Sequence, residues 1–100
     1  EFANALKTLQ GATIHQRTPE RVAHRRADKI RERIVLDIEY VGEQDGKFVV
    51  EVLGEAGLYI KELISGDGGR TRPSLAEILD RPAHVFSLDV VQVEGAKEGD

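Results

Sequence analysis

Two alternating segments joined by a tight turn constrain the fold of this chain more than any other feature. Arg33 to Val41 and Lys47 to Leu53 both place apolar side chains at every second position, the pattern of a half-buried strand. The side chains expected to share a face are Ile34, Leu36, Ile38 and Tyr40 in the first segment, and Phe48, Val50 and Val52 in the second. Between them, Asp45-Gly46 is a strong signal for a two-residue turn. The sequence therefore predicts an antiparallel hairpin.

Shorter elements precede this hairpin. Ala12 to Gln16 predicts a short strand. Thr18-Pro19 then marks the start of a short helix ending near Arg25, because threonine caps a helix and proline suits its first position. The opening Glu1-Phe2 could be a cloning remnant, and we give it no weight in the fold prediction.

Two helices and a strand are expected after the hairpin. Leu58 to Ile64 has near-helical apolar spacing, and Ser65 to Arg70 forms the loop that ends this helix. Ser74-Leu75-Ala76-Glu77 is a capping box that opens a helix ending near Asp80. His84 to Val93 predicts a last strand.

These elements predict an α+β fold: a small antiparallel sheet, made of the hairpin plus a C-terminal strand, with two or three short helices. One hundred residues allow a single domain, and we expect an ordered core at residues 12–94 and a tail at 95–100. The chain contains no methionine, and we interpret it as a fragment. Open edges on so thin a sheet indicate that more sheet lies beside it in the intact protein.

The composition excludes several kinds of site. With no cysteine, disulfides and thiolate metal sites are excluded, which fits a cytoplasmic location. The three histidines are not at metal-ligand spacing, and no Ser-His-Asp arrangement can be defended. The longest apolar run is far too short to cross a membrane. We expect a protein that binds neither metal nor membrane.

Charge is distributed unevenly along the chain. Residues 17–33 contain seven Lys/Arg against three Asp/Glu, whereas residues 34–100 contain six against fourteen. Although the net charge is −4, this asymmetry is typical of a basic face on an acidic domain. Charge alone leaves a nucleic-acid contact and a solvated, salt-bridged surface equally open.

The most unusual stretch is Gly-Asp-Gly-Gly-Arg-Thr at residues 66–71. Successive N–H groups in a glycine-rich loop can hold an anion, and Arg70 and Arg72 would add bonds to phosphate. No Gly-Lys-Ser/Thr follows, so this is not a Walker loop. The alternative is a plain connection between two helices. Asp67 is interpreted as a turn former rather than a catalytic group.

An aromatic residue and a cation, Tyr59 and Lys61, directly follow the hairpin. Tyr59 could stack on a nucleic-acid base and Lys61 could pair with a carboxylate. Taken alone, these two residues favour an ordinary amphipathic helix start.

The same residues carry a resemblance to pseudouridine synthases. Ala56 to Leu63 resembles the G-T-Y-I-K/R motif of these enzymes, with Leu58 where threonine is usual, and Ala83 to Leu88 resembles their A-H-V-x-x-L strand. Four segments closely resemble one branch, the archaeal and eukaryotic synthase for positions 54 and 55 of the tRNA TΨC arm. They are Gln16 to Val22, His24 to Ala27, Ile60 to Glu62 and Ser65 to Pro73.

This resemblance implies an isomerase that flips the target uridine out of its stack. An aspartate attacks the nucleoside, the base detaches and turns, and it rejoins through carbon without a cofactor. The resemblance places Tyr59 against the flipped base, Lys61 beside the aspartate and Leu88 beneath the pocket. The residues expected to contact tRNA are Arg21, His24, Arg25, Arg26, Arg70 and Arg72.

One departure from the family matters. Nothing in this chain matches the arginine-containing loop that carries the nucleophilic aspartate, nor the N-terminal RNA-binding domain. We therefore expect a C-terminal half-site that needs the remainder of the same polypeptide's catalytic domain and is inactive alone. The alternatives are a non-catalytic RNA-binding module and a protein-interaction module.

Overall fold

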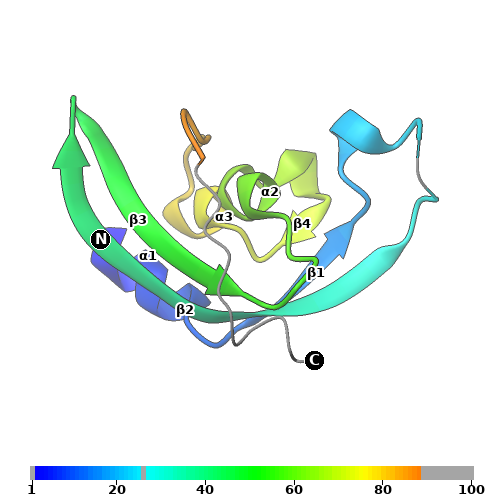
Figure 1. Ribbon diagram of the computed structural model, residues 1–100, viewed down its shortest axis with the longest axis horizontal. Coiled ribbons are helices and arrows are strands. Elements are labelled where there is room, and N and C mark those ends of the chain that lie inside the picture. Colours follow the sequence, from blue (N-terminus) through cyan, green and yellow to red (C-terminus); the bar gives the residue numbers. More distant parts are fainter. Residues whose placement is uncertain (1, 26, 89–100) are drawn as a thin grey trace.

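A computed structural model describes residues 2–25 and 27–88, and these residues adopt an α+β fold (Figure 1). The elements in chain order are α1 (Phe2–Leu9), β1 (Thr13–Arg17), the 3-10 turn η1 (Glu20–Val22), β2 (Ile30–Gln44), β3 (Lys47–Gly54), α2 (Ile60–Ser65), the 3-10 turn η2 (Asp67–Gly69), β4 (Thr71–Arg72) and α3 (Leu75–Leu79). The strands form one antiparallel sheet in the order β3-β2-β1-β4. The predicted fold class is confirmed.

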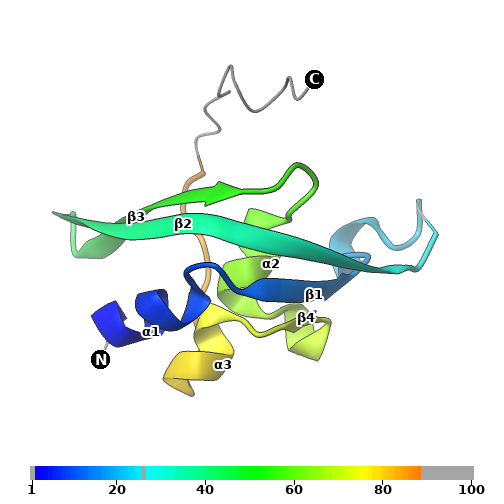
Figure 2. The same ribbon diagram turned by 90° about the horizontal axis from the view of Figure 1, so that it is seen from below.

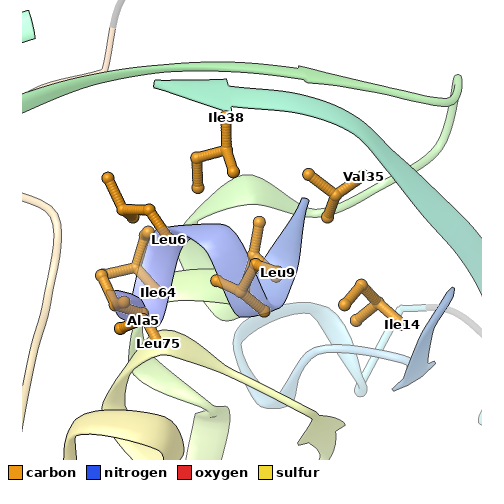
Figure 3. Close-up of a cluster of buried hydrophobic side chains, with 9 residues drawn as sticks. Ala5, Leu6, Leu9, Ile14, Val35, Ile38, Ile64 and Leu75 are labelled. Atoms are coloured by element: carbon orange, nitrogen blue, oxygen red, sulfur yellow. The ribbon is translucent and has the colours of Figure 1, made fainter. Parts of the chain in front are cut away.

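The three α-helices of the described residues lie on the same side of the sheet, and none of them covers its other side (Figure 2). The apolar core forms between the helices and the sheet (Figure 3). Its buried members are Ala5, Leu6, Leu9, Ile14, Val35, Ile38, Leu63, Ile64 and Leu75. No helix among the described residues is long and apolar enough to span a bilayer.

The hairpin forms where the sequence predicts it. Gln44 pairs with Lys47, and the turn residues Asp45 and Gly46 have positive φ angles of 53° and 74°. Positive φ at both central residues is the requirement of a type I′ turn, whose twist matches the flanking strands. Val50 and Val52 pack against the core, as their predicted face requires.

The alternation predicted for β2 is wrong at its start. The pairing with β3 shifts between Val35 and Asp37, and again between Tyr40 and Gly42. A bulge of this kind adds one residue to a strand and moves every later side chain to the other face. Val35 is consequently buried, while Leu36, expected in the core, is 50% exposed.

Helix α1 is an element that the sequence analysis missed. Ala5, Leu6 and Leu9 are buried, and the Phe2 ring centroid lies 4.4 Å from that of Phe48. Phe2 is therefore part of the packing rather than a remnant, and the core begins before residue 12. The signal was available, because apolar residues at positions 2, 5, 6 and 9 have helical spacing.

Of the two predicted helix starts, the one at Ser74 is confirmed and the one at Thr18 is wrong. At α3, the Ser74 hydroxyl accepts a hydrogen bond from the Glu77 N–H at 3.1 Å, as a capping residue should. The predicted helix at 19–25 is instead the single turn η1. Thr18 caps nothing there, because its hydroxyl donates to the Ala27 carbonyl at 2.6 Å and accepts from the Lys29 N–H at 3.1 Å.

The predicted C-terminal strand is not seen where the structure describes it. Residues 84–88 pair with no described strand, and residues 89–93 lie outside the described range. Phe86 is 68% exposed and contacts His84, with ring centroids 4.7 Å apart. An alternating pattern indicates a half-buried surface, and it forms a strand only where another strand is available to pair with it. The fourth strand is the two-residue β4, paired with β1.

Candidate functional site

Tyr59 lies at the N-terminus of α2, in the connection that leaves β3. Its backbone is held by the side chain of Gln16 on β1, which is only 2% exposed. The Gln16 amide nitrogen donates to the Tyr59 carbonyl, and the Tyr59 N–H donates to the Gln16 amide oxygen, both at 2.9 Å. The buried Gln16 amide thus pairs with both backbone polar groups of Tyr59, as a neighbouring strand would. This fixes the backbone position from which the Tyr59 side chain projects.

Arg21 approaches the ring of Tyr59 from η1. Its Nε donates to the Glu62 Oε2 at 2.8 Å and its Nη2 donates to Oε1 at 3.3 Å, while its Cζ lies 5.9 Å from the Tyr59 ring centroid. Glu62 is 6% exposed, so this two-point bond forms on a buried carboxylate. The hydrogen bond with Glu62 raises the pKa of Arg21, and the guanidinium stays charged beside the ring.

Lys61 follows Tyr59 in the first turn of α2 and is exposed. Within residues 2–25 and 27–88, its ammonium takes part in no ion pair. The neighbouring carboxylate, Glu62, is occupied by Arg21. The arrangement leaves Lys61 available to an acidic group from outside the described residues.

Leu88 is not brought to Tyr59 in this structure. It is 40% exposed, and Phe86, two residues earlier, lies 4.7 Å from the ammonium of Lys47. Lys47 begins β3, whereas Tyr59 follows the other end of that strand. The role of Leu88 beneath the pocket stays a prediction.

Within the charge-rich stretch 17–33, the basic segment, residues 18–25 and 27–29, lies in a loop closed at its base (Figure 1). Thr18 and Lys29 bond across the base, with the Thr18 N–H donating to the Lys29 carbonyl at 2.9 Å. His24 and Arg25 are exposed on this loop, as RNA contact requires. Arg26, also predicted to contact RNA, lies outside the described residues.

Arg70 points inward, and its predicted contact with phosphate stays a prediction. Its Nε and Nη2 both donate to the Thr18 carbonyl, at 3.0 and 2.6 Å. Carboxylates of Asp28, Asp67 and Glu20 lie 3.3 to 3.8 Å from its guanidinium, and its side chain is 19% exposed. A guanidinium with so many protein acceptors has little capacity left for RNA. Arg72 differs, since its side chain is 68% exposed and, among the described residues, its guanidinium pairs with Glu77 alone.

The glycine-rich loop is a hydrogen-bonded connection from α2 to β4. The N–H groups of Asp67, Gly69, Arg70 and Thr71 all bond to acceptors between Ser65 and Asp67. Gly66 ends α2 with a φ of 84°, and a Cβ there would lie 2.8 Å from the Ser74 hydroxyl, so glycine is required. Asp67 also has positive φ and acts as a turn former. The geometry favours the connection over an anion cradle.

Gln16 and Glu62 are the supporting residues that sequence reasoning missed. Gln16 shares the inward face of β1 with Ile14, and Glu62 is an acid on the buried side of a short apolar helix. A polar residue at an inward position is the signal that could have found both. Among the described residues, no three His, Asp or Glu side chains are grouped to hold a metal ion.

Comparison with known proteins identifies the family. A family model described as "Pus10, C-terminal" matches residues 1–94, from the start of α1 through the glycine-rich loop and beyond α3. The chain belongs to this family. The resemblance noted in the sequence is thus confirmed, and the Pus10 C-terminal match includes the helix that sequence reasoning passed over.

Three curated relatives show how much of a longer protein the chain covers, and each is named tRNA pseudouridine synthase Pus10. The protein of Halorubrum lacusprofundi is 53% identical over 97% of this chain and 23% of its own length. The protein of Methanopyrus kandleri is 51% identical over 92% and 21%, and that of Archaeoglobus fulgidus 55% identical over 89% and 25%. The chain therefore spans about a quarter of the relatives it matches.

Proposed function

We propose that this chain is the C-terminal half-site of a tRNA pseudouridine synthase, an isomerase that converts uridine to pseudouridine in the TΨC arm. The observation that carries this proposal is that Tyr59, whose backbone Gln16 holds and whose ring Arg21 approaches, shares a helix start with Lys61, which makes no ion pair with a described carboxylate. An aromatic face can stack on a flipped base, and a nearby cation can keep a catalytic carboxylate ionised. The names of the relatives support the same activity.

In this proposal each group has a separate task. Tyr59 lies against the flipped base, since every base offers a π-face. Lys61 pairs with a nucleophilic aspartate that lies outside these 100 residues, and keeps it ionised. Leu88 packs beneath the pocket once the rest of the protein is in place. The reaction is an isomerisation within the nucleoside, and no cofactor is assigned.

The remainder of the catalytic domain is the proposed partner of the helix-free side of the sheet. On β2 and β3, Leu36, Val41 and Leu53 are 50%, 55% and 42% exposed. Apolar side chains at such density on a sheet are typical of a covered surface. Together with tRNA, this partner completes the site, and we place the complex in the cytoplasm.

The first test concerns the missing nucleophile. The 100-residue chain alone is expected to release no tritium from tRNA carrying C5-labelled uridine, because nothing in it matches the loop that carries the nucleophilic aspartate. The full-length protein, assayed in parallel, should release tritium. Turnover by the chain alone would show that the nucleophile lies within it and would return Asp67 to consideration.

The second test concerns RNA contact by the basic segment. In the full-length protein, Arg25→Ala combined with Arg26→Ala should weaken tRNA binding and flatten its salt dependence by close to one log–log unit per lost phosphate contact. Filter binding across a salt series measures both quantities.

Lys7 provides the matched control for this test. It is exposed on α1, at the opposite end of the molecule from the basic segment (Figure 1), and Lys7→Ala should leave the slope unchanged. Unaltered binding by the double variant at low salt would mean that these charges form only a solvated surface.

A further inference from the structure

Hydrogen bonds connect the basic segment to the glycine-rich loop, and both sides contribute donors. From the loop, Arg70 donates twice to the Thr18 carbonyl, and the Asp67 carboxylate accepts the Glu20 N–H at 2.9 Å. From the end of β1, directly before the segment, the Arg17 N–H donates to the Arg70 carbonyl at 2.8 Å. These bonds join residues about fifty positions apart, and they converge on the base of the loop that bears His24 and Arg25.

The carboxylate of Asp28 completes this connection at the far end of the segment. It lies 3.3 Å from the Arg70 guanidinium and also pairs with Arg17. Arg70 therefore contacts Thr18 at the start of the segment and Asp28 near its end. One side chain that touches both ends of a loop restricts how its tip is presented.

We propose that Arg70 is a positioning residue, assisted by Asp67, that holds residues 18–25 and 27–29 in the conformation that contacts RNA. It acts through the Thr18 carbonyl and the Asp28 carboxylate, and it binds no phosphate itself. This inference rests on the proposed function, because it assumes that the exposed basic side chains of the segment contact tRNA. On this proposal, the glycine-rich motif positions the basic segment and does not bind an anion.

The burial of Arg70 favours this role over direct phosphate contact. Arg70 is 19% exposed and Arg72, two residues later, is 68% exposed, so the same loop offers one inward and one outward arginine. An ordered acceptor set of one carbonyl and three carboxylates also opposes an incoming phosphate by like charge. Arg72 therefore serves as the matched comparison.

A double-mutant cycle in the full-length protein separates the two roles. Arg25→Ala is expected to weaken tRNA binding about fivefold in the wild-type background and less than about twofold once Arg70 is alanine, because a loosened loop no longer presents Arg25. The same cycle with Arg72→Ala should be additive, since Arg72 acts on its own phosphate.

Conservative replacement provides a second discriminating readout. Arg70→Lys keeps the charge but loses the planar fork that bonds twice to one carbonyl, so it should resemble Arg70→Ala. Hydrogen exchange at the Thr18 and Lys29 amides should be faster in both variants, while exchange in the β2–β3 hairpin stays at the wild-type rate and shows that the domain is folded.

Three results together would overturn the proposal in favour of direct phosphate contact by Arg70. They are additive losses in the Arg25/Arg70 cycle, wild-type binding by Arg70→Lys, and a salt slope that Arg70→Ala reduces by about one log–log unit. If Arg25→Ala leaves binding unchanged in the wild-type background, the proposed RNA contact fails and the positioning role fails with it. If Arg25→Ala weakens binding but shows no coupling to Arg70, the positioning role alone is wrong.

Discussion

Lys61→Met in the full-length protein is expected to slow single-turnover pseudouridine formation by about 10- to 1000-fold at neutral pH, with tRNA affinity nearly unchanged. Methionine keeps much of the stem of lysine and removes its charge. In this structure Lys61 makes no ion pair with any described carboxylate, whereas the adjacent Glu62 is held by Arg21. On the proposed function, the interaction that this variant loses is the one with the nucleophilic aspartate.

The proposed role of Lys61 also determines how the rate of the variant should change with pH. A cation beside a buried carboxylate lowers the pKa of that carboxyl, so removing Lys61 raises it. At a fixed pH a larger fraction of the aspartate is then protonated and unreactive. The rate of Lys61→Met should accordingly recover as pH rises, and single-turnover rates measured across pH test this directly.

Lys61→Arg is the matched control, because it retains the charge and related enzymes carry either cation at this position. It should be the mildest change at this site. If Lys61→Met follows the wild-type rate over the whole pH range, Lys61 is not the partner of the aspartate, and the active site does not lie at this helix start.

Tyr59→Phe is expected to slow the chemical step by about 100-fold or more while tRNA binding survives. Phenylalanine keeps the flat face that stacks on the base and removes the hydroxyl proposed to transfer a proton as the base rejoins. Gln16 bonds only to the backbone of residue 59, so the replacement leaves the anchoring of the ring intact. Binding and single-turnover assays on one preparation separate stacking from proton transfer.

Tyr40→Phe is the control for loss of a tyrosine hydroxyl. Tyr40 lies in a separate aromatic cluster with Phe2 and Phe48, and its ring centroid is 5.9 Å from that of Phe48. The control should have the wild-type rate. A Tyr59→Phe variant as fast as Tyr40→Phe would show that the Tyr59 hydroxyl has no part in the reaction, and would leave stacking as its only proposed task.

Local sequence determined the elements whose physical cause is local. Asp45-Gly46 supports positive φ at two successive residues, so the β2–β3 hairpin is predictable from four residues. Ser74 caps α3 by a bond to an N–H three residues away. The family resemblance likewise rests on short motifs, and Tyr59 and Lys61 could be named from it.

Tertiary structure decided the features that depend on partners far along the chain. The bulge after Val35 reverses which side chains of β2 face the core, and only the pairing with β3 places it. Phe2 packs against the core, and its ring centroid lies 4.4 Å from that of Phe48. The helical spacing at positions 2, 5, 6 and 9 indicates a buried helix face, but it does not show that Phe48 lies beside Phe2.

The arginines illustrate the same division most clearly. Arg70 and Arg72 stand two apart in one glycine-rich motif, and the sequence predicts phosphate contact for both. In the fold, Arg70 meets the Thr18 carbonyl and Asp28, whereas Arg72 stays exposed. Composition determines how much charge the chain carries, but the direction of each side chain depends on which acceptors the fold brings near it, and those come from distant segments.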